Sequence, residues 1–200
     1  MLLAIDSATA ACSAALIDGA ALVDERFELV GRGHAERLLP MIEELLGGRR
    51  PSGILVDCGP GSFTGVRVGL AAAHGLAIGW GVPLLGYSSM AAIAATADAE
   101  RLAVALHGGH GQLFVQSFTN APLQPVADLQ SLLPDDAARA FDEAVVIGSG
   151  AEALVAARGH GEARNALPRA ADARLLPEAL RSLPPRPLYG RAPDAKPLPQ

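Results

Sequence analysis

The sequence contains little lysine, little cysteine and few aromatic residues. The shortage of lysine and the shortage of cysteine each exclude a class of protein. Its only lysine is Lys196 and its formal net charge is −5, which argues against a chain that grips nucleic acid by itself. The two cysteines, Cys12 and Cys58, are too few for a disulfide framework or a cysteine zinc site. Each lies in an apolar run typical of a strand, so we expect two buried, reduced thiols.

Long apolar runs are also missing. The first residues, MLLAIDSATAACSAALIDG, have no basic region, and Asp6 interrupts their apolar stretch, so we expect no secretory signal. No run is long enough to cross a bilayer. These absences predict a cytoplasmic protein without a membrane partner. Half of the 200 residues are apolar, which is enough for one sizeable core or two small lobes.

Short strands open the chain, and strands then alternate with helices. The hairpin signal Asp18-Gly19 separates the second and third strands. Pro40 removes one helical hydrogen bond, so we expect the first helix to kink or to start near Pro40. The pattern predicts a mixed sheet with an antiparallel start and flanking helices. The predicted strands are 2–5, 12–17, 21–30, 53–58 and 83–87, and the predicted helices are 34–46, 64–79 and 88–97.

The second half has a weaker pattern. Its predicted strands are 102–106, 112–118 and one within 143–150, and its predicted helices are 151–158 and 172–182. From Pro184 onward the chain is rich in proline, so we expect it to be extended, wrapping back or disordered. A boundary near residue 100 divides the chain into two expected units, 1–100 and 101–200.

The stretch AIDSATAACSAALID resembles the first phosphate loop of the actin, Hsp70 and sugar-kinase superfamily. In those proteins the aspartate holds a metal-bound water, and a glycine two residues later lets the backbone approach a phosphate. Here that position is Ala8, whose methyl group hinders such an approach. Asp6 and Ser7 therefore either keep a ligand role or only end the strand through turn hydrogen bonds.

The stretch CGPGSFTGVRVGLAAAHGLAIG, residues 58–79, combines a glycine-rich loop with a following helix. Such a loop can aim backbone N–H groups at an anion beside a helix N-terminus. It lacks the lysine of a nucleotide-hydrolysing P-loop, and its glycines could equally serve a tight strand-to-helix turn. The candidate residues of a vestigial anion or nucleotide loop are Asp6, Ser7, Gly61, Ser62 and Thr64.

Small residues recur every four positions along the predicted helix 64–79. Such a stripe packs either on the protein's own sheet or against a helix of a partner. The preceding helix carries six large apolar residues in the nine positions 38–46, more than one core-facing stripe needs, which favours an interaction surface. The predicted partner contacts are Leu38, Met41, Ile42, Leu45, Gly65, Gly69, Ala73, Leu76 and Ala77.

The sequence predicts no catalytic residue and no metal ligand. None of the five histidines has a partner at the i, i+4 spacing of a helical metal site. Ser62 in GSFTG does not fit the G-x-S-x-G nucleophile motif, because a glycine directly precedes the serine.

Four stretches together resemble the TsaB (YeaZ) family: LLAIDSATAACSAALIDG, HAERLLPMIEELL, GPGSFTGVRVGLAAAHGLAIGWGVPLLGYSSMAAIA and PLYGRAPDA. The match is dense over residues 2–95. The resemblance implies an α/β fold of the actin-like ATPase, sugar-kinase and Hsp70 type with two small lobes. It also implies a role in making threonylcarbamoyladenosine on tRNA, as a non-catalytic partner of the paralogue TsaD, with TsaE as a third, ATP-hydrolysing component.

The resemblance further indicates what the chain has lost. TsaD carries a His-Met-Glu-Gly-His metal motif, and the corresponding ligand positions here are Ser89, Ala91 and Ile93. These residues and Ala8 argue against the rival hypothesis of a degenerate sugar-kinase-like or M22 glycoprotease-like enzyme. The expected partners are TsaD in a heterodimer, TsaE in a ternary complex and a second copy when the chain is alone. No direct, stable tRNA binding and no tightly bound cofactor are expected, with ATP or ADP restricted to the complex interface.

Overall fold

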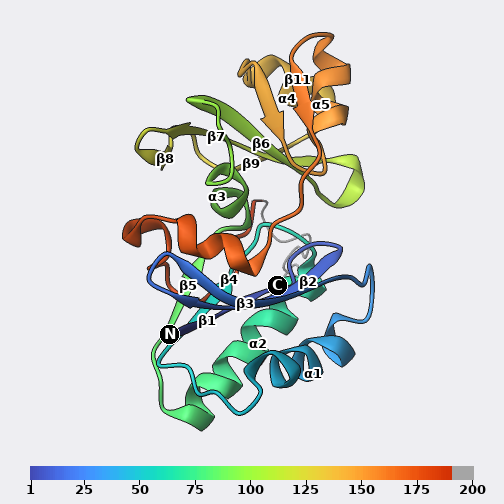
Figure 1. Ribbon diagram of the computed structural model, residues 1–200. Coiled ribbons are helices and arrows are strands. Elements are labelled where there is room, and N and C mark those ends of the chain that lie inside the picture. The colour runs from blue at the N-terminus through green and yellow to red at the C-terminus, as the bar shows by residue number, and fades with distance from the viewer. Residues whose placement is uncertain (191–200) are drawn as a thin grey trace, which may run out of the picture.

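The computed structural model describes residues 1–190, which form two lobes around two separate sheets (Figure 1). The N-terminal lobe holds a five-stranded sheet in the order β3-β2-β1-β4-β5. Its strands are β1 (Leu2–Asp6), β2 (Ala11–Asp18), β3 (Ala21–Leu29), β4 (Ile54–Asp57) and β5 (Leu84–Tyr87). The first three strands pair antiparallel, whereas β4 and β5 run parallel to β1.

Different helices cover the two faces of this sheet. The helices α1 (His34–Leu46) and α2 (Phe63–Trp80) pack on the outer face. The 3-10 helix η2 (Ala170–Leu175) contacts β1, β2 and β3 on the face toward the second lobe. The helix α3 (Ser89–Ala94) contacts both η2 and strands of the second lobe, so it joins the two halves.

The second lobe holds a six-stranded sheet in the order β11-β10-β6-β7-β8, with β9 also paired to β7. Its strands are β6 (Arg101–His107), β7 (Leu113–Asn120), β8 (Leu123–Pro125), β9 (Gln130–Leu132), β10 (Val145–Ile147) and β11 (Glu162–Arg164). The helices α4 (Pro134–Ala140) and α5 (Ala151–Arg158) complete this lobe. The predicted fold class, with its antiparallel start, mixed sheet and flanking helices, is confirmed.

The first helix has its predicted bounds, 34–46, but one of the two expectations for Pro40 fails. It starts at His34 and contains Pro40 in its interior, so the prediction of a start delayed to Pro40 is wrong. Pro40 lies on the exposed side, while the opposite side of α1 packs on the sheet. That burial outweighs the single hydrogen bond that a proline removes.

The predicted helix over 172–182 is also wrong. Two short 3-10 turns, η2 and η3 (Glu178–Leu180), replace it, and Pro177 stands between them. The elements β8, β9, α4 and β11 are absent from the sequence prediction. The three strands among them have only three residues each, too few for a periodic pattern.

The predicted partner contacts need a correction as well. Of those nine residues, all except Leu76 are buried inside this chain. On α1 the buried residues belong to the core between the helices and the sheet. At Gly69 a Cβ atom would lie 2.6 Å from Ser7 Oγ, because the small-residue stripe of α2 faces the protein's own first strand. The other side of both helices faces solvent.

The chain end returns to the first lobe. Leu183 pairs with Gly86 beside β5, and the Leu188 N–H donates to the Cys58 carbonyl oxygen at 2.8 Å. The tail thus wraps back as far as Gly190, and its predicted remainder, 191–200, lies outside the described residues. Together with η2, the segment 170–190 packs on the first lobe, so the predicted unit 101–200 does not keep to one lobe. No helix within residues 1–190 is long and apolar enough to span a membrane.

Candidate functional site

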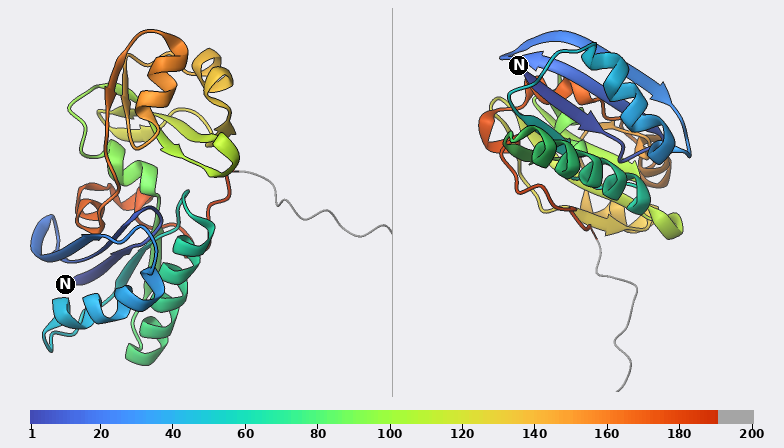
Figure 2. Two further views of the ribbon diagram at one scale, coloured as in Figure 1. Left: turned by 90° about the vertical axis from the view of Figure 1, so that its right-hand side faces the viewer. Right: turned by 90° about the horizontal axis from the view of Figure 1, so that it is seen from below.

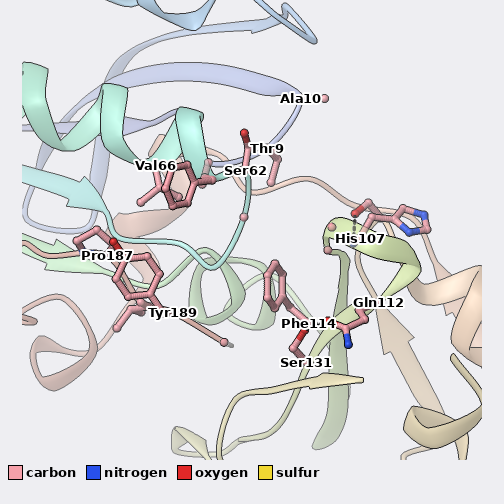
Figure 3. Close-up of a pocket in the computed structure, with 18 of the residues that line it drawn as sticks. Thr9, Ala10, Ser62, Val66, His107, Gln112, Phe114, Ser131, Pro187 and Tyr189 are labelled. Carbon is pink, nitrogen blue, oxygen red and sulfur yellow. Dashed lines mark hydrogen bonds between the residues drawn. The ribbon is translucent and has the colours of Figure 1, made fainter. Parts of the chain in front are cut away.

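A cleft of about 870 Å³ lies between the two lobes (Figure 3). The first lobe contributes the β1–β2 turn, the glycine loop and the start of α2. The second lobe contributes the turn between β6 and β7. Residues 187–190 of the returning chain end line the same cleft, and Gly31, Ser131, Ser149 and Leu167 add single positions from other segments.

The glycine loop and the β1–β2 turn are locked to each other. The Ser62 N–H donates to the Ala8 carbonyl oxygen at 2.6 Å, and the Ser7 hydroxyl donates to the Gly65 carbonyl oxygen at 2.8 Å. A Cβ atom at Gly61 would lie 2.1 Å from the Ala8 oxygen, and one at Gly65 would lie 2.1 Å from the Ser7 oxygen. The two backbones therefore approach so closely that only glycine fits at both positions.

The hydroxyl of Ser62 also has a local partner, since it accepts the Gly65 N–H at the first turn of α2. Among the predicted anion-loop residues, only Gly61 and Ser62 line the cleft. Thr64 is exposed on the helix, while Asp6 and Ser7 are buried behind the loop. The β1–β2 turn and the glycine loop could bind a phosphate between them, but here they are hydrogen-bonded to each other.

Behind the loops lies a buried pair of carboxyl groups, Asp6 and Asp57. Asp6 Oδ1 accepts the Ala8 N–H at 3.1 Å, and its Oδ2 has no partner among the described residues. Burial and then the charge of Asp57 raise the pKa of Asp6 well above its usual value. Burial raises the pKa of Asp57 to about 6.

Asp57 is held more firmly than Asp6. Its Oδ1 accepts the Gly59 N–H at 2.8 Å, and its Oδ2 accepts the Ser89 hydroxyl at 2.6 Å. Sequence reasoning found Asp6 and named Ser89 as a lost ligand position, but it missed Asp57 and the bond that Ser89 donates to it. The available signal was that Asp57, like Asp6, ends a buried strand that runs into a loop of small residues.

The positions that correspond to a metal motif are part of the core. Ser89 is fully buried and donates to Asp57, and Ala91 and Ile93 are each 2% exposed in the core between the lobes. Within residues 1–190, no three His, Cys, Asp or Glu side chains gather as a metal site would require.

Both thiols are buried and unpaired, as predicted. Burial is the main cause that raises the pKa of Cys12 to about 11 and that of Cys58 to about 12. Neither thiol lines the cleft, and neither is ionised near neutral pH.

A second hollow, of about 520 Å³, lies on the outer surface where α1 and α2 run side by side (Figure 2). We call it the outer groove. It is formed by Leu39, Ile42, Glu43, Leu46, Gly48, Arg49, Arg50, Leu76, Gly79 and Trp80. Of the nine predicted partner contacts, only Ile42 and Leu76 line it. Most of the residues predicted as partner contacts therefore lie on the inward sides of α1 and α2, and a partner surface on these helices stays a prediction.

Comparisons with known proteins place the chain among relatives. The family model described as TsaD, tRNA N6-adenosine threonylcarbamoyltransferase, matches residues 28–163. The tRNA threonylcarbamoyladenosine biosynthesis protein TsaB of Escherichia coli is 38% identical over 122 residues, which cover 56% of this chain and 52% of that protein. The chain spans about half the length of the curated relatives it matches, 52% and 42% for the two TsaB proteins.

Two solved structures from Pseudomonas aeruginosa resemble the whole fold. An uncharacterized protein with similarity to the peptidase YeaZ has a TM-score of 0.78 at 29% identity, covering 95% of this chain and 99% of its own. The structure named YeaZ has a TM-score of 0.73 at 31% identity, covering 86% of this chain and 87% of its own. Both lobes and most of the chain are thus shared with these proteins, and the chain belongs to the TsaB (YeaZ) family.

Proposed function

We propose that this protein is a non-catalytic subunit in the biosynthesis of threonylcarbamoyladenosine on tRNA, and that it supports TsaD by binding to it. TsaB relatives are named as proteins of this biosynthesis. The observation that carries the proposal is the outer groove, a surface hollow that apolar and charged side chains line together, on a protein of this family.

The composition of the outer groove suits a protein partner. Leu39 is 50% exposed, and Leu46, Leu76 and Trp80 are partly exposed around the same hollow. Arg49, Arg50 and Glu43 supply charge at the edge. A central aromatic and aliphatic cluster beside arginines is typical of the residues that dominate binding energy at protein interfaces. Gly79 leaves the C-terminal end of α2 open to close approach.

The interior of the first lobe supports a role without chemistry. Ser89, Ala91 and Ile93 occupy the positions of a metal motif, and the first of these is committed to Asp57. The loops that would hold phosphates are bonded to each other instead. The fold of a nucleotide-binding protein is kept here as a scaffold that carries two helices on its surface.

One groove cannot hold two partners at once. We propose that a second copy of this chain occupies the outer groove when TsaD is absent, and that homodimer and heterodimer exclude each other. In the ternary complex TsaE is the third component, with ATP or ADP at the interface between subunits. Because the chain has a net charge of −5 and tRNA is an anion, we expect the partners to bind the tRNA.

Reconstitution of tRNA modification with purified TsaD and TsaE tests the proposal. Adding this chain should switch on threonylcarbamoyladenosine formation, and Leu39→Glu should weaken TsaD binding by about tenfold or more, equivalent to about 1.4 kcal/mol. The matched control is Ile78→Glu, because Ile78 is 82% exposed on α2 but does not line the groove. Leu39→Glu binding as tightly as the control would refute the docking surface.

The same assay separates a second candidate function, that of a transferase. The family model that matches most of the chain is named for a threonylcarbamoyltransferase. This match is the observation that favours a transferase activity of the chain itself. Modification of tRNA by this chain without TsaD would establish the enzyme and overturn the subunit role.

A further inference from the structure

The charge around the interlobe cleft is one-sided. Its lining contains no aspartate or glutamate among residues 1–190, although the chain has 21 acidic residues against 16 lysines and arginines. The ionisable side chains that do line it are Arg67, His107, His110 and Tyr189. A cleft with walls of one charge sign concentrates ligands of the opposite sign. This cleft therefore favours anions, in a protein that is acidic as a whole.

Arg67 supplies the permanent positive charge. Its guanidinium carbon lies 3.2 Å from the centroid of the Phe63 ring, and its NH2 group donates to the Tyr189 hydroxyl at 3.1 Å. No carboxylate within residues 1–190 forms an ion pair with it, in contrast to Arg37, which pairs with both Glu28 and Glu44. An arginine held against an aromatic ring is oriented and still has N–H groups to offer an anion.

Aromatic side chains from separate segments surround the same space. Phe63 comes from the first turn of α2, Phe114 from β7 and Tyr189 from the returning chain end. In the view of Figure 3 the Phe114 side chain lies between those of Tyr189 and His107. Val66 and Leu188 add aliphatic surface. Ligand sites commonly combine such an apolar lining with a few oriented polar groups, in volumes of about 300–1,000 Å³.

The junction between the β1–β2 turn and the glycine loop has no room for phosphates. The space where the β1–β2 turn and the glycine loop would enclose them is closed by the Ser62–Ala8 and Ser7–Gly65 hydrogen bonds. The Cβ of Ala8 points into this junction, where it would lie 3.0 Å from a Cβ at Gly61. An occupant therefore lies outside this junction, against Arg67 and the aromatic side chains of the lining.

We propose that the interlobe cleft binds an aromatic organic anion, with its ring among Phe63, Phe114 and Tyr189 and its anionic group on Arg67. This site is separate from the outer groove and does not depend on the docking of TsaD. The shared chemistry, a planar ring with one compact anionic group, is offered by aromatic carboxylates and by nucleoside monophosphates.

The test uses the full chain and two fluorescent probes with the same ring system. 1-Anilinonaphthalene-8-sulfonate carries an anion, and N-phenyl-1-naphthylamine is its neutral counterpart. The sulfonate should bind at one site, about tenfold tighter than the neutral probe and with a dissociation constant of about 10–100 μM. Arg67→Gln should abolish this preference and leave binding of the neutral probe unchanged. The matched control is Arg139→Gln, because Arg139 lies on α4, does not line the cleft and pairs with Asp136.

Competition then distinguishes the two sources of the ligand. Indole-3-acetate or AMP should displace the sulfonate probe, and the stronger competitor identifies the class. Phe114→Ala should weaken the binding of both probes. The thermal midpoint of Arg67→Gln should equal that of the parent, which shows that its fold is intact. The proposal fails if Arg67→Gln retains the preference for the anion, if neither competitor displaces the probe, or if ATP displaces it tenfold better than AMP.

Discussion

At the scale of single residues, three glycines of the first lobe are required because other atoms lie where their Cβ atoms would be. Gly61 and Gly65 each face a carbonyl oxygen of the β1–β2 turn, and Gly69 faces the Ser7 hydroxyl. The spacing of these glycines was visible in the sequence, but the identity of the facing backbone was not, since it belongs to a segment more than fifty residues away. The sequence of a small-residue stripe therefore does not show whether the stripe packs on the protein's own sheet or on a partner.

A substitution at Gly69 tests this packing. Gly69→Ala should lower the free energy of unfolding by about 1–3 kcal/mol, because its Cβ would lie 2.6 Å from Ser7 Oγ. The matched control is Gly75→Ala on the same helix, where a Cβ meets nothing within 4 Å and a gain of about 0.5–1 kcal/mol is expected. Urea denaturation of both variants measures the difference, and equal effects would show that α2 does not pack this closely.

The buried carboxyl pair predicts a pH dependence with a definite sign. The folded-state pKa values of Asp6 and Asp57 are both raised, the latter from 3.8 to about 6, so the folded protein binds more protons than the unfolded chain. Stability contributed by protonated carboxyl groups is therefore present in acid and is lost as pH rises from about 4 through 6 and beyond.

Asp6→Asn should remove much of that loss. Its amide can donate from the position of the unpartnered Oδ2 while the carbonyl oxygen still accepts the Ala8 N–H. Between pH 5 and pH 8 the variant should gain about 1–3 kcal/mol of unfolding free energy relative to the parent, at about 1.4 kcal/mol per pKa unit. Asp24→Asn is the control of opposite sign, because hydrogen bonds from Arg49 and Arg26 lower the pKa of Asp24. A parallel pH dependence of Asp6→Asn and parent would contradict the buried pair.

At the scale of elements, periodicity located α1 and α2 but left open which side of each faces the sheet. The apolar residues of α1 are divided between the two sides: Leu38, Met41 and Leu45 are buried, whereas Leu39 is half exposed. The sequence has more apolar residues here than one buried stripe needs, and the structure places the surplus Leu39 on the outward side. The 3-10 turns η2 and η3 were mistaken for one helix because their apolar residues follow each other closely, although Pro177 stands between the two turns and only η2 buries residues.

The returning segment 183–190 is an element without regular structure that nonetheless carries stability. Leu188 packs on the core of the first lobe, and its N–H donates to the Cys58 carbonyl oxygen. Leu188→Ala should lower the free energy of unfolding by about 1–2 kcal/mol, less than for a fully buried leucine, since Leu188 is only partly buried. Leu175→Ala is the matched control, an exposed leucine outside the hydrophobic clusters. Chemical denaturation distinguishes them, and an equal cost would mean that the segment rests loosely on the lobe.

At the scale of the whole molecule, the two lobes share a core that neither could complete alone. Tyr87 of the first lobe and Phe118 of the second are both buried in it, together with α3 and η2. The fold class could be predicted because motifs near the N-terminus identify it. The interlobe cleft could not, since its lining combines segments from both lobes and the chain end whose proximity only the folded chain reveals.

The return of residues 170–190 to the first lobe has a consequence for synthesis on the ribosome. The Ala170 N–H donates to Ser13 Oγ, a contact that spans 157 positions, and η2 covers the sheet face of β1, β2 and β3. When the first hundred residues have left the exit tunnel, that apolar face is still without its cover. The N-terminal lobe is therefore synthesised first but completes its folding last. Its strands stay exposed to chaperones or to aggregation until translation is nearly complete.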